Sequence, residues 1–399
     1  MTRGNGPRAN GDGASLAAGL DALRSLGSGT LSELAAAAGL SRQTMEGVLV
    51  KLASAGLVEH RIDSVLPHRA GGRPARLSRF RADVGYVVGV DLVGTTVKAA
   101  LSDLSGRWVQ VGTLRPPAPT TAAPDLTPVV EAVHGVLQEA SVRLDLLRAV
   151  GVGTSGVARA DGSMLTSPLI KPWTEGNVGE QLSEGIGAPV VMDNDLTLAA
   201  IAESRLGALR DAEIAVYVET FYSPAARIMI DGTVVRGRRR AAGELGALKA
   251  FAGQGYGVST YFEDMARIGA SLARLRDGTG TAADETERDR LADALAPPLA
   301  ALALALDPEL VALGGALGRY AEVLAPALLP RIGESAAGGP PLHPDIVGAQ
   351  FVAEGVLAGA IDQAFEHLPE RIYGIEGIEP PLQTDVSVPQ VGAPVAAGG

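Results

Sequence analysis

The sequence predicts an α/β protein in two parts, a small basic head at its amino end and a larger acidic body. Strand and helix patterns alternate from Asp83 onward, which indicates an α/β domain. Residues 1–82 hold 11 Lys and Arg against 6 Asp and Glu, whereas residues 83–399 hold 23 against 39. This distribution predicts that the head contacts an anionic polymer and that the body repels it.

Composition narrows the possible classes of protein. A chain of 399 residues suggests two or three domains, and 46% apolar residues allow sizeable cores. The absence of cysteine excludes disulfides, cysteine zinc sites and thiol catalysis. We expect residues 1–13 to be disordered and to carry no secretory signal. The apolar run over 297–306 is too short and broken to span a bilayer, so we expect a soluble cytoplasmic protein.

The head has the local signals of a helix-turn-helix. Helices are predicted over 15–26, 30–38 and 41–54, followed by a hairpin of strands over 57–62 and 75–80. Thr30 and Glu33 have capping-box spacing, Gly39 permits a sharp turn, and Ser41 caps the third helix. We therefore expect residues 14–82 to form a winged helix-turn-helix DNA-binding domain, although a helical hairpin used only for packing would have the same pattern.

The candidate DNA-binding residues are Ser41, Arg42, Gln43, Thr44 and Arg73. The first four begin the third helix, where Arg suits guanine and Gln suits adenine in the major groove. Arg73 lies in the Gly-Gly-Arg-Pro run between the two strands, and an arginine in so slim a loop can enter a narrow minor groove. An ordinary interdomain linker is the alternative for this loop.

The body contains further predicted elements and five short motifs. Strands are expected over 86–91, 96–101, 149–153, 189–192, 214–219, 226–230 and 310–313, and helices over 126–147, 196–206, 281–305 and 344–367. Residues 371–399 are expected to form a loose tail. The motifs are Val90–Gly106 with Asp91 at a strand end, Gly151–Val157, Pro189–Asp195, Ala242–Gly246 and Leu313–Leu317. A further short piece, Ser167–Leu169 with Trp173, lies between the second and third of these motifs.

The order and spacing of these motifs resemble the ROK family (repressors, open reading frames and kinases) of the actin-like ATPase superfamily, in particular its repressor branch. With the head, the resemblance covers residues from about 15 to 359. It implies a two-lobed actin-like ATPase (ribonuclease H-like) body. Lobe I would comprise residues 83–200, and lobe II residues 201–370, with a C-terminal helix returning to lobe I.

The resemblance also implies ligand-binding roles. Asn194 and Asp195 match the pair that holds a hexose hydroxyl, with Asp195 as the base in kinase members. Glu244 matches a sugar-binding glutamate, and Gly156 matches the backbone turn beside the sugar. Gly314 and Gly315 match the turn beside the adenosine of the nucleotide. Asp91 matches the acidic residue near the phosphates and metal.

Departures from the family pattern indicate that the chemistry has been lost. The expected glycine-rich phosphate turn reads Thr220-Phe221-Tyr222-Ser223-Pro224-Ala225-Ala226-Arg227, although bare backbone must approach phosphoryl oxygens. Leu92-Val93 replace a glycine in the first phosphate loop. Ala247 replaces the zinc-binding histidine, and the zinc cysteines are absent. We therefore expect no kinase activity, cofactor or metal, with Asp195 only a vestigial base.

Together these features predict a transcriptional regulator, most simply a repressor. The head would bind double-stranded operator DNA, the body would form a homodimer or homotetramer, and the kinase-like site would sense a sugar or related small molecule. The alternatives are an active ATP-dependent sugar kinase with an appended head, and a DNA-binding dimer that senses nothing. The run Arg236–Arg240 is expected as a surface loop; contact with DNA, a phosphorylated ligand or an acidic partner is the alternative.

Overall fold

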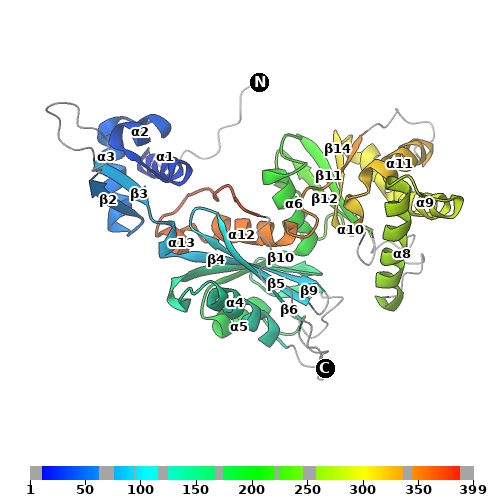
Figure 1. Ribbon diagram of the computed structural model, residues 1–399, viewed down its shortest axis with the longest axis horizontal. Coiled ribbons are helices and arrows are strands. Elements are labelled where there is room, and N and C mark those ends of the chain that lie inside the picture. Colours follow the sequence, from blue (N-terminus) through cyan, green and yellow to red (C-terminus); the bar gives the residue numbers. More distant parts are fainter. Residues whose placement is uncertain are drawn as a thin grey trace.

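The computed structural model describes residues 11–62, 76–93, 96–115, 125–166, 174–220, 224–245, 258–335 and 344–386. Figure 1 shows the head at one end of an elongated molecule, a first β-sheet in the middle and a second β-sheet at the other end. The body thus has the mixed α/β architecture that the alternating pattern predicts.

The head consists of three helices and a small antiparallel sheet. The helices are α1 (Gly11–Leu26), α2 (Leu31–Ala37) and α3 (Arg42–Ser54). The strands are β1 (Ser28–Thr30), β2 (Val58–Ile62) and β3 (Arg76–Phe80), in the order β1-β3-β2. The expected helices and hairpin are therefore confirmed, and β1 is an addition. The Glu33 backbone N–H donates to Thr30 Oγ1 at 3.3 Å, and the Thr30 N–H donates to Glu33 Oε2 at 2.8 Å, so the capping box is formed.

The body contains two five-stranded sheets of the same topology. The first sheet has the order β10-β7-β4-β5-β6 and the second β13-β12-β11-β14-β15. In each sheet, three strands that are consecutive in the chain pair antiparallel to one another. Two later strands then pair parallel on the other side of the first of these three strands. The first sheet comprises β4 (Tyr86–Val93), β5 (Thr96–Asp103), β6 (Trp108–Leu114), β7 (Leu147–Thr154) and β10 (Val190–Asn194). The second comprises β11 (Ile214–Thr220), β12 (Pro224–Ile230), β13 (Thr233–Val234), β14 (Leu310–Leu313) and β15 (Asp345–Gly348), and β8 (Val157–Ala158) with β9 (Met164–Thr166) forms a separate hairpin.

Helices cover both sheets. In Figure 1, α4 (Thr127–Glu139) and α5 (Val178–Ile186) lie on one face of the first sheet and α12 (Gly355–His367) on the other. α6 (Asp195–Leu206) packs between α12 and the second sheet, whose remaining helices are α8 (Val258–Arg276), α9 (Ala282–Leu306), α10 (Gly315–Gly318) and α11 (Ala321–Ser335). No helix in these described stretches is long and apolar enough to cross a membrane.

Close backbone contact holds α12 in place. A Cβ atom added to Gly151 of β7 would overlap the Ala360 carbonyl of α12, and one added to Gly359 would overlap the Leu198 carbonyl of α6. Only glycine permits these approaches, because a carbonyl group of a packed helix cannot swing aside as a side chain can. The contacts fix α6, and with it the start of that helix at Asp195, against the first sheet.

Two expectations about secondary structure are wrong, and some elements were not expected. The helix expected over 126–147 ends at Glu139, and Ser141 has a left-handed φ of 56° before β7 begins at Leu147. The helix expected over 344–367 begins only at Gly355, because residues 345–348 form the edge strand β15. Strand β6 was not expected. Short apolar runs fit a buried strand or a helix equally well, which explains the second error.

The tail expected over 371–399 is not loose between residues 371 and 386. α13 (Pro369–Tyr373) is followed by residues 374–386, which we call the C-terminal strap. The Tyr373 hydroxyl donates to the Leu104 carbonyl at 2.8 Å, and Trp108 Nε1 donates to Gln383 Oε1 at 2.7 Å. Buried aromatic rings and satisfied polar groups hold this segment against the first sheet, despite a composition that suggests a coil.

Candidate functional site

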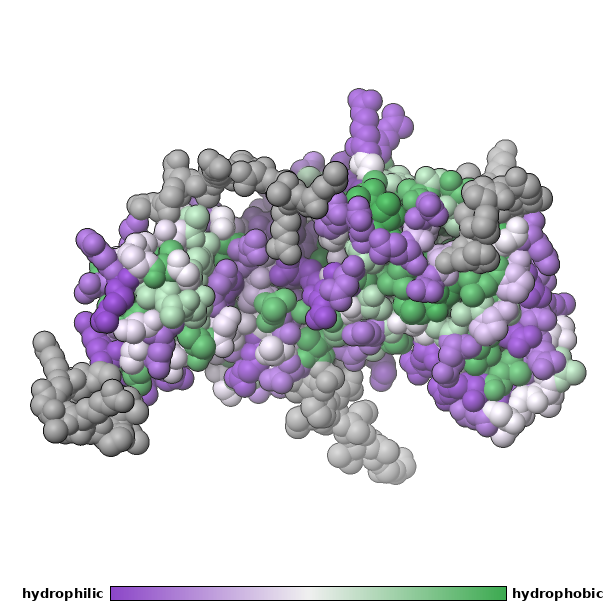
Figure 2. Space-filling view, turned by 90° about the horizontal axis from the view of Figure 1, so that it is seen from above, coloured by the Kyte–Doolittle hydropathy of each residue, from purple (hydrophilic) through white to green (hydrophobic). Residues whose placement is uncertain are grey.

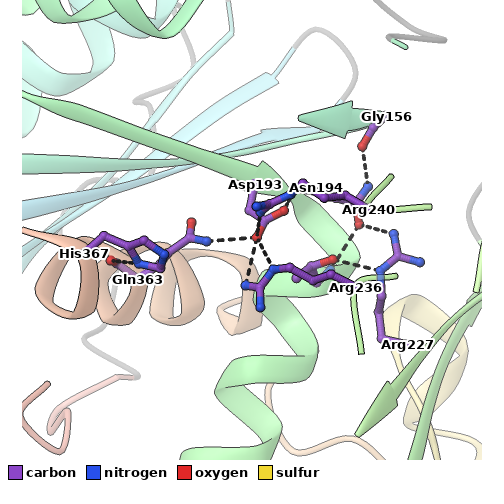
Figure 3. Close-up of polar contacts among 9 residues, drawn as sticks. Gly156, Asp193, Asn194, Arg227, Arg236, Arg240, Gln363 and His367 are labelled. Atoms are coloured by element: carbon purple, nitrogen blue, oxygen red, sulfur yellow. Dashed lines mark hydrogen bonds and ion pairs between the residues drawn. The ribbon is translucent and has the colours of Figure 1, made fainter. Parts of the chain in front are cut away.

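Polar residues of the body gather where the parallel strands of the first sheet end. Asp91 lies on β4, Gly156 follows β7, and Asn194 ends β10. In open α/β sheets this carboxyl edge is where ligands bind. We use the name strand-end site for the five residues Gly156, Asn194, Asp195, Arg227 and Glu244, which Figure 3 shows in part.

Asn194 organises the near side of the strand-end site. Its side-chain Nδ2 donates to the Gly156 carbonyl at 2.9 Å, and its Oδ1 accepts from the Thr197 N–H at 3.1 Å, which caps α6. Asp195 follows directly as the first residue of α6, and its Oδ1 accepts the Leu196 N–H at 2.8 Å. Gly156, which the resemblance assigns to the turn beside a sugar, thus lies next to Asn194, but much of the hydrogen-bonding capacity of Asn194 is already used within the protein.

Arg227 occupies the centre of the strand-end site. Its side chain is only 3% exposed. One nitrogen, Nη2, donates to Asn194 Oδ1 and to Glu244 Oε1, each at 2.6 Å, and Nε donates to Thr197 Oγ1 at 2.8 Å. Asn194 and Glu244, which the resemblance assigns to a sugar, thus both contact one guanidinium group, and that group belongs to β12 of the second sheet. Figure 3 shows Asn194 beside Arg227.

A second set of ionic contacts lies next to the strand-end site. Asp193 Oδ2 accepts from Arg240 Nη2 at 2.7 Å, from Arg236 Nη2 at 3.0 Å and from Gln363 Nε2 at 2.9 Å. Burial alone would raise the pKa of Asp193, but the two guanidinium groups outweigh it and hold that pKa below its usual value. The expectation of a surface loop over Arg236–Arg240 is thus only half correct, since Arg238 and Arg239 are exposed but the two end residues point inward.

Carboxyl groups dominate the region where the resemblance expects a nucleotide. Burial, together with the nearby Asp195, raises the pKa of Asp91 to about 7, and Lys98 opposes this. Burial, with the Asp195 and Asp91 carboxylates, raises the pKa of Glu219 to about 8. Burial also raises the pKa of Asp195, against the N–H of Leu196 and the charge of Arg227. Each carboxylate disfavours ionisation of its neighbours, so additional negative charge is unfavourable here.

Side chains from β11 also fill the turn that the resemblance assigns to the adenosine. A Cβ atom on Gly314 would overlap the Tyr217 hydroxyl, and one on Gly315 would overlap the Glu219 carboxyl group. Both side chains therefore lie directly on this glycine turn. Among the described residues, no group of three or more His, Asp or Glu side chains is arranged to hold a metal ion. Residues 221–223, the Ala247 position and Arg73 lie outside the described part of the chain.

The candidate DNA-binding residues of the head lie at the start of α3. Ser41, Arg42, Gln43 and Thr44 are all exposed. Ser41 Oγ accepts from the Thr44 N–H at 3.1 Å and contacts Thr44 Oγ1 at 2.8 Å, so these two side chains serve as the cap. The side chains of Arg42 and Gln43 make no hydrogen bond or ion pair with any other described residue. Both are therefore available to a partner.

Comparison with known proteins assigns a family to part of the body. Residues 87–256 match the ROK family. The chain contains a ROK family domain. A putative xylose repressor from Caldicellulosiruptor sp. (strain Rt8B.4) is 25% identical over 215 residues, which cover 52% of this chain and 51% of that protein. The chain spans between 37% and 51% of the length of the curated relatives that it matches first.

Solved structures share the fold of the ROK domain. The crystal structure of a ROK hexokinase from Thermus thermophilus has a TM-score of 0.54 at 25% identity, covering 71% of this chain and 99% of the hexokinase. A ROK family transcriptional regulator, described as a homologue of the E. coli MLC protein, has a TM-score of 0.63 at 19% identity, covering 90% of this chain and 98% of the regulator. The fold thus occurs in both regulators and sugar kinases.

The central residue of the site, Arg227, was not among those singled out from the sequence. The available signal was a lone arginine in the otherwise apolar strand Ala225-Ala226-Arg227-Ile228-Met229. A cation in a buried strand is rarely found without a partner, so an arginine at this position indicates acidic or amide neighbours. Those partners lie 17 and 33 residues away, and local pattern does not reveal such pairs.

Proposed function

We propose that this ROK protein is a transcriptional regulator, most simply a repressor, whose head binds operator DNA as a winged helix-turn-helix and whose body transfers no phosphate. The exposed start of α3, where Arg42 and Gln43 make no side-chain hydrogen bond or ion pair with another described residue, carries the proposal. α3 buries Met45, Val48, Leu49 and Leu52 and presents the opposite face to solvent. A helix that packs on its domain along one face and is exposed to solvent along the other can enter the major groove of DNA.

Two further observations support a DNA-binding head. The β2–β3 hairpin follows α3 at the position of a wing, and Arg61 and Arg79 on it are 62% and 55% exposed. Residues 83–399 make up only about four fifths of the chain. A structural alignment with the ROK regulator over 90% of the chain therefore includes part of the head. Arg73 would extend this surface into the minor groove.

Loss of kinase chemistry is supported by what fills the nucleotide region. Phosphoryl transfer depends on positioning and on stabilisation of negative charge. Here Tyr217 and Glu219 lie on the Gly314–Gly315 turn, and burial together with neighbouring carboxylates already raises the pKa values of Asp91 and Glu219. A triphosphate would bring further negative charge to this place. Asp195 is therefore a vestigial base in our proposal.

The strand-end site is the proposed location of an effector, held by Gly156, Asn194, Asp195 and Glu244. Arg227 already occupies the groups of Asn194 and Glu244 that the resemblance assigns to a hexose. The effector would therefore differ from a neutral hexose or would displace the guanidinium group. We expect glucose, mannose and galactose to leave the Tm of the full chain unchanged. A sugar derivative that binds would raise the Tm in proportion to the logarithm of its concentration. If no compound in a broad panel does so, the body acts only as a scaffold.

The C-terminal strap provides a route from the strand-end site to the head. α6 begins at Asp195 and ends near Arg205, whose Nη2 donates to the Pro380 carbonyl at 3.0 Å and whose Nε lies 2.8 Å from Asp362 Oδ1. From the head, Arg24 donates through Nη1 and Nη2 to the adjacent Glu379 carbonyl, each at 3.0 Å. A shift of α6 would thus reach the head through two neighbouring carbonyl groups of the strap.

This route can be tested with Arg205→Met. If the strap couples the two sites, the variant keeps DNA binding and effector binding but loses the effect of one on the other, which is typically 5- to 150-fold in affinity. Arg210→Met is the control, because Arg210 is 64% exposed and, among the residues that the structure describes, forms an ion pair with Asp211 alone. Full coupling in Arg205→Met would exclude the strap as the route.

The proposed homodimer or homotetramer would use the body. Figure 2 shows apolar side chains gathered over the part of the surface that belongs to the second sheet and its helices. Leu304 on α9 and Ile230 on β12 are 50% and 40% exposed. Apolar surface of this kind is typical of an interface between subunits. Light scattering of the full chain at micromolar concentration tests this, and a monomer would refute it.

The regulatory function is tested by DNA binding and ADP release together. Fluorescence anisotropy with a duplex from the promoter beside its own gene is expected to show specific binding that weakens steeply with salt. Arg42→Ala and Gln43→Ala should reduce affinity for that duplex, whereas Arg143→Ala, an exposed site on the body, should not. A coupled ADP-release assay on hexoses and amino sugars is expected to show no turnover. Robust turnover would favour the sugar kinase instead.

A further inference from the structure

The exposed face of α3 has an unusual composition at its centre. Its outer stripe, which we define as Gln43, Gly47, Val50 and Ser54, follows a four-three-four spacing that places all four on one side of a helix. All four are exposed, and the buried residues of α3 lie on the opposite side. The two central positions, Gly47 and Val50, are neither charged nor hydrogen-bonding, although they face solvent.

Gly47 lowers the stability of α3, and neither the packing of the head nor its backbone conformation requires a glycine at this position. Glycine is a poor helix former because it loses the most backbone freedom. Gly47 has no left-handed φ, and a Cβ atom added to it would meet nothing within 4 Å. Gly19 of α1 is different, because a Cβ atom there would overlap Val48 where α1 packs on α3. Packing therefore explains Gly19, but neither packing nor backbone conformation explains Gly47.

Val50 is the second unfavourable choice on the same face. Its side chain is 61% exposed, more than any other large apolar side chain among the described residues of the head. A β-branched residue loses side-chain freedom in a helix, so a solvated position would favour a polar, unbranched residue. Val50 lies one turn after Gly47, which leaves an apolar group beside a stretch of bare backbone.

We propose that Gly47 and Val50 form the point of closest approach between α3 and the major groove, and that Val50 packs against the methyl group of a thymine. The missing side chain at Gly47 lets the helix sit closer to the base edges than any other residue would. The C5-methyl of thymine is the apolar group that the major groove offers to an aliphatic side chain. Arg42 and Lys51, both exposed on α3, border the stripe with positive charge, the exposed Glu46 borders it with negative charge, and the head as a whole is basic. This inference rests on the proposed DNA-binding function and adds the chemistry of the operator: a T·A base pair in each half-site.

The first test separates the stability of α3 from its affinity for DNA. A duplex is first selected from a random pool by the wild-type full chain. Gly47→Ala is then expected to raise the Tm by about 1–3 °C, because alanine favours the helix, and to weaken binding of that duplex about tenfold, because the methyl group holds the helix away. Gly135→Ala is the matched control. Gly135 lies inside α4, and a Cβ atom there also meets nothing within 4 Å. It should raise the Tm similarly and leave DNA affinity unchanged.

The second test identifies the partner of Val50. Each thymine of the selected duplex is replaced in turn by uracil, which lacks only the methyl group. One replacement per half-site should weaken wild-type binding about three- to tenfold and should have no effect on Val50→Ala. Binding by Gly47→Ala that equals wild type, or uracil effects that persist unchanged in Val50→Ala, would overturn the inference. Failure of the wild-type chain to select any duplex would instead refute the proposed function.

Discussion

Replacing Arg227 by methionine would test whether the guanidinium group holds the two halves of the body together. Methionine has a similar volume, so the change removes charge and hydrogen bonds rather than bulk. The side chain loses its bonds to Asn194, Glu244 and Thr197. Hydrogen bonds to charged groups contribute about 1.5–3 kcal/mol each, and breaking a fully buried pair costs about 3–5 kcal/mol. Because the Glu244 side chain is 33% exposed, water can solvate its carboxylate and offset part of this cost. We therefore expect the free energy of unfolding to fall by about 3 kcal/mol.

Urea unfolding followed by circular dichroism measures this loss. With an m-value of about 3 kcal/mol per molar, the midpoint should fall by about 1 M. Adding Glu244→Gln to Arg227→Met should recover about 1 kcal/mol, because an amide is easier than a carboxylate to leave without a cation. Arg143→Met is the control, since Arg143 is 79% exposed and its loss should not move the midpoint. If Arg227→Met unfolds at the wild-type midpoint, the guanidinium group does not clamp the strand-end site.

Three further predictions concern the body and the head. Because the pKa of Glu219 is raised to about 8, the folded protein holds a proton there that the unfolded chain releases above its ordinary pKa of 4.5. Stability should therefore fall as pH rises from about 4.5 to 8, and Glu219→Gln should flatten that fall in unfolding midpoints measured across this range; an unchanged slope would contradict the assignment. Gly151→Ala should destabilise the body by about 3 kcal/mol, measured as a lower Tm, because its methyl group would overlap the Ala360 carbonyl, and a wild-type Tm would contradict the close approach. Thr30→Ala should destabilise α2 by about 1 kcal/mol through loss of its cap, seen as faster amide exchange in α2, and unchanged exchange would argue against the capping box.

Features that depend on neighbours in the chain were predictable. Thr30 and Glu33 are three residues apart, and Ser41 directly precedes α3, so the caps follow from the local order of side chains. The head helices and the β2–β3 hairpin were predicted for this reason. Strand β6, with Trp108, Val109 and Val111 in Trp-Val-Gln-Val-Gly-Thr-Leu, also carries strand-forming residues and could have been found.

Features that depend on distant packing were not predictable in the same way. Local composition gave no reason to place the strap against Trp108, because the contact between Trp108 and Gln383 joins residues 275 positions apart. The strand at 345–348 became a strand because β14 offers it a parallel edge, and an apolar run alone does not reveal that edge.

The sequence alone determined that this chain has a basic head and an acidic α/β body, because charge and periodicity are properties of the chain itself, whereas the resemblance of its motifs to the ROK family implied that Asn194 and Glu244 share one site. Only the tertiary structure decided what occupies that site. Arg227 reaches Asn194 and Glu244 because β12 of the second sheet lies opposite the end of β10 in the first. A pairing across two sheets is set by how the sheets pack, and no local pattern along the chain encodes that distance.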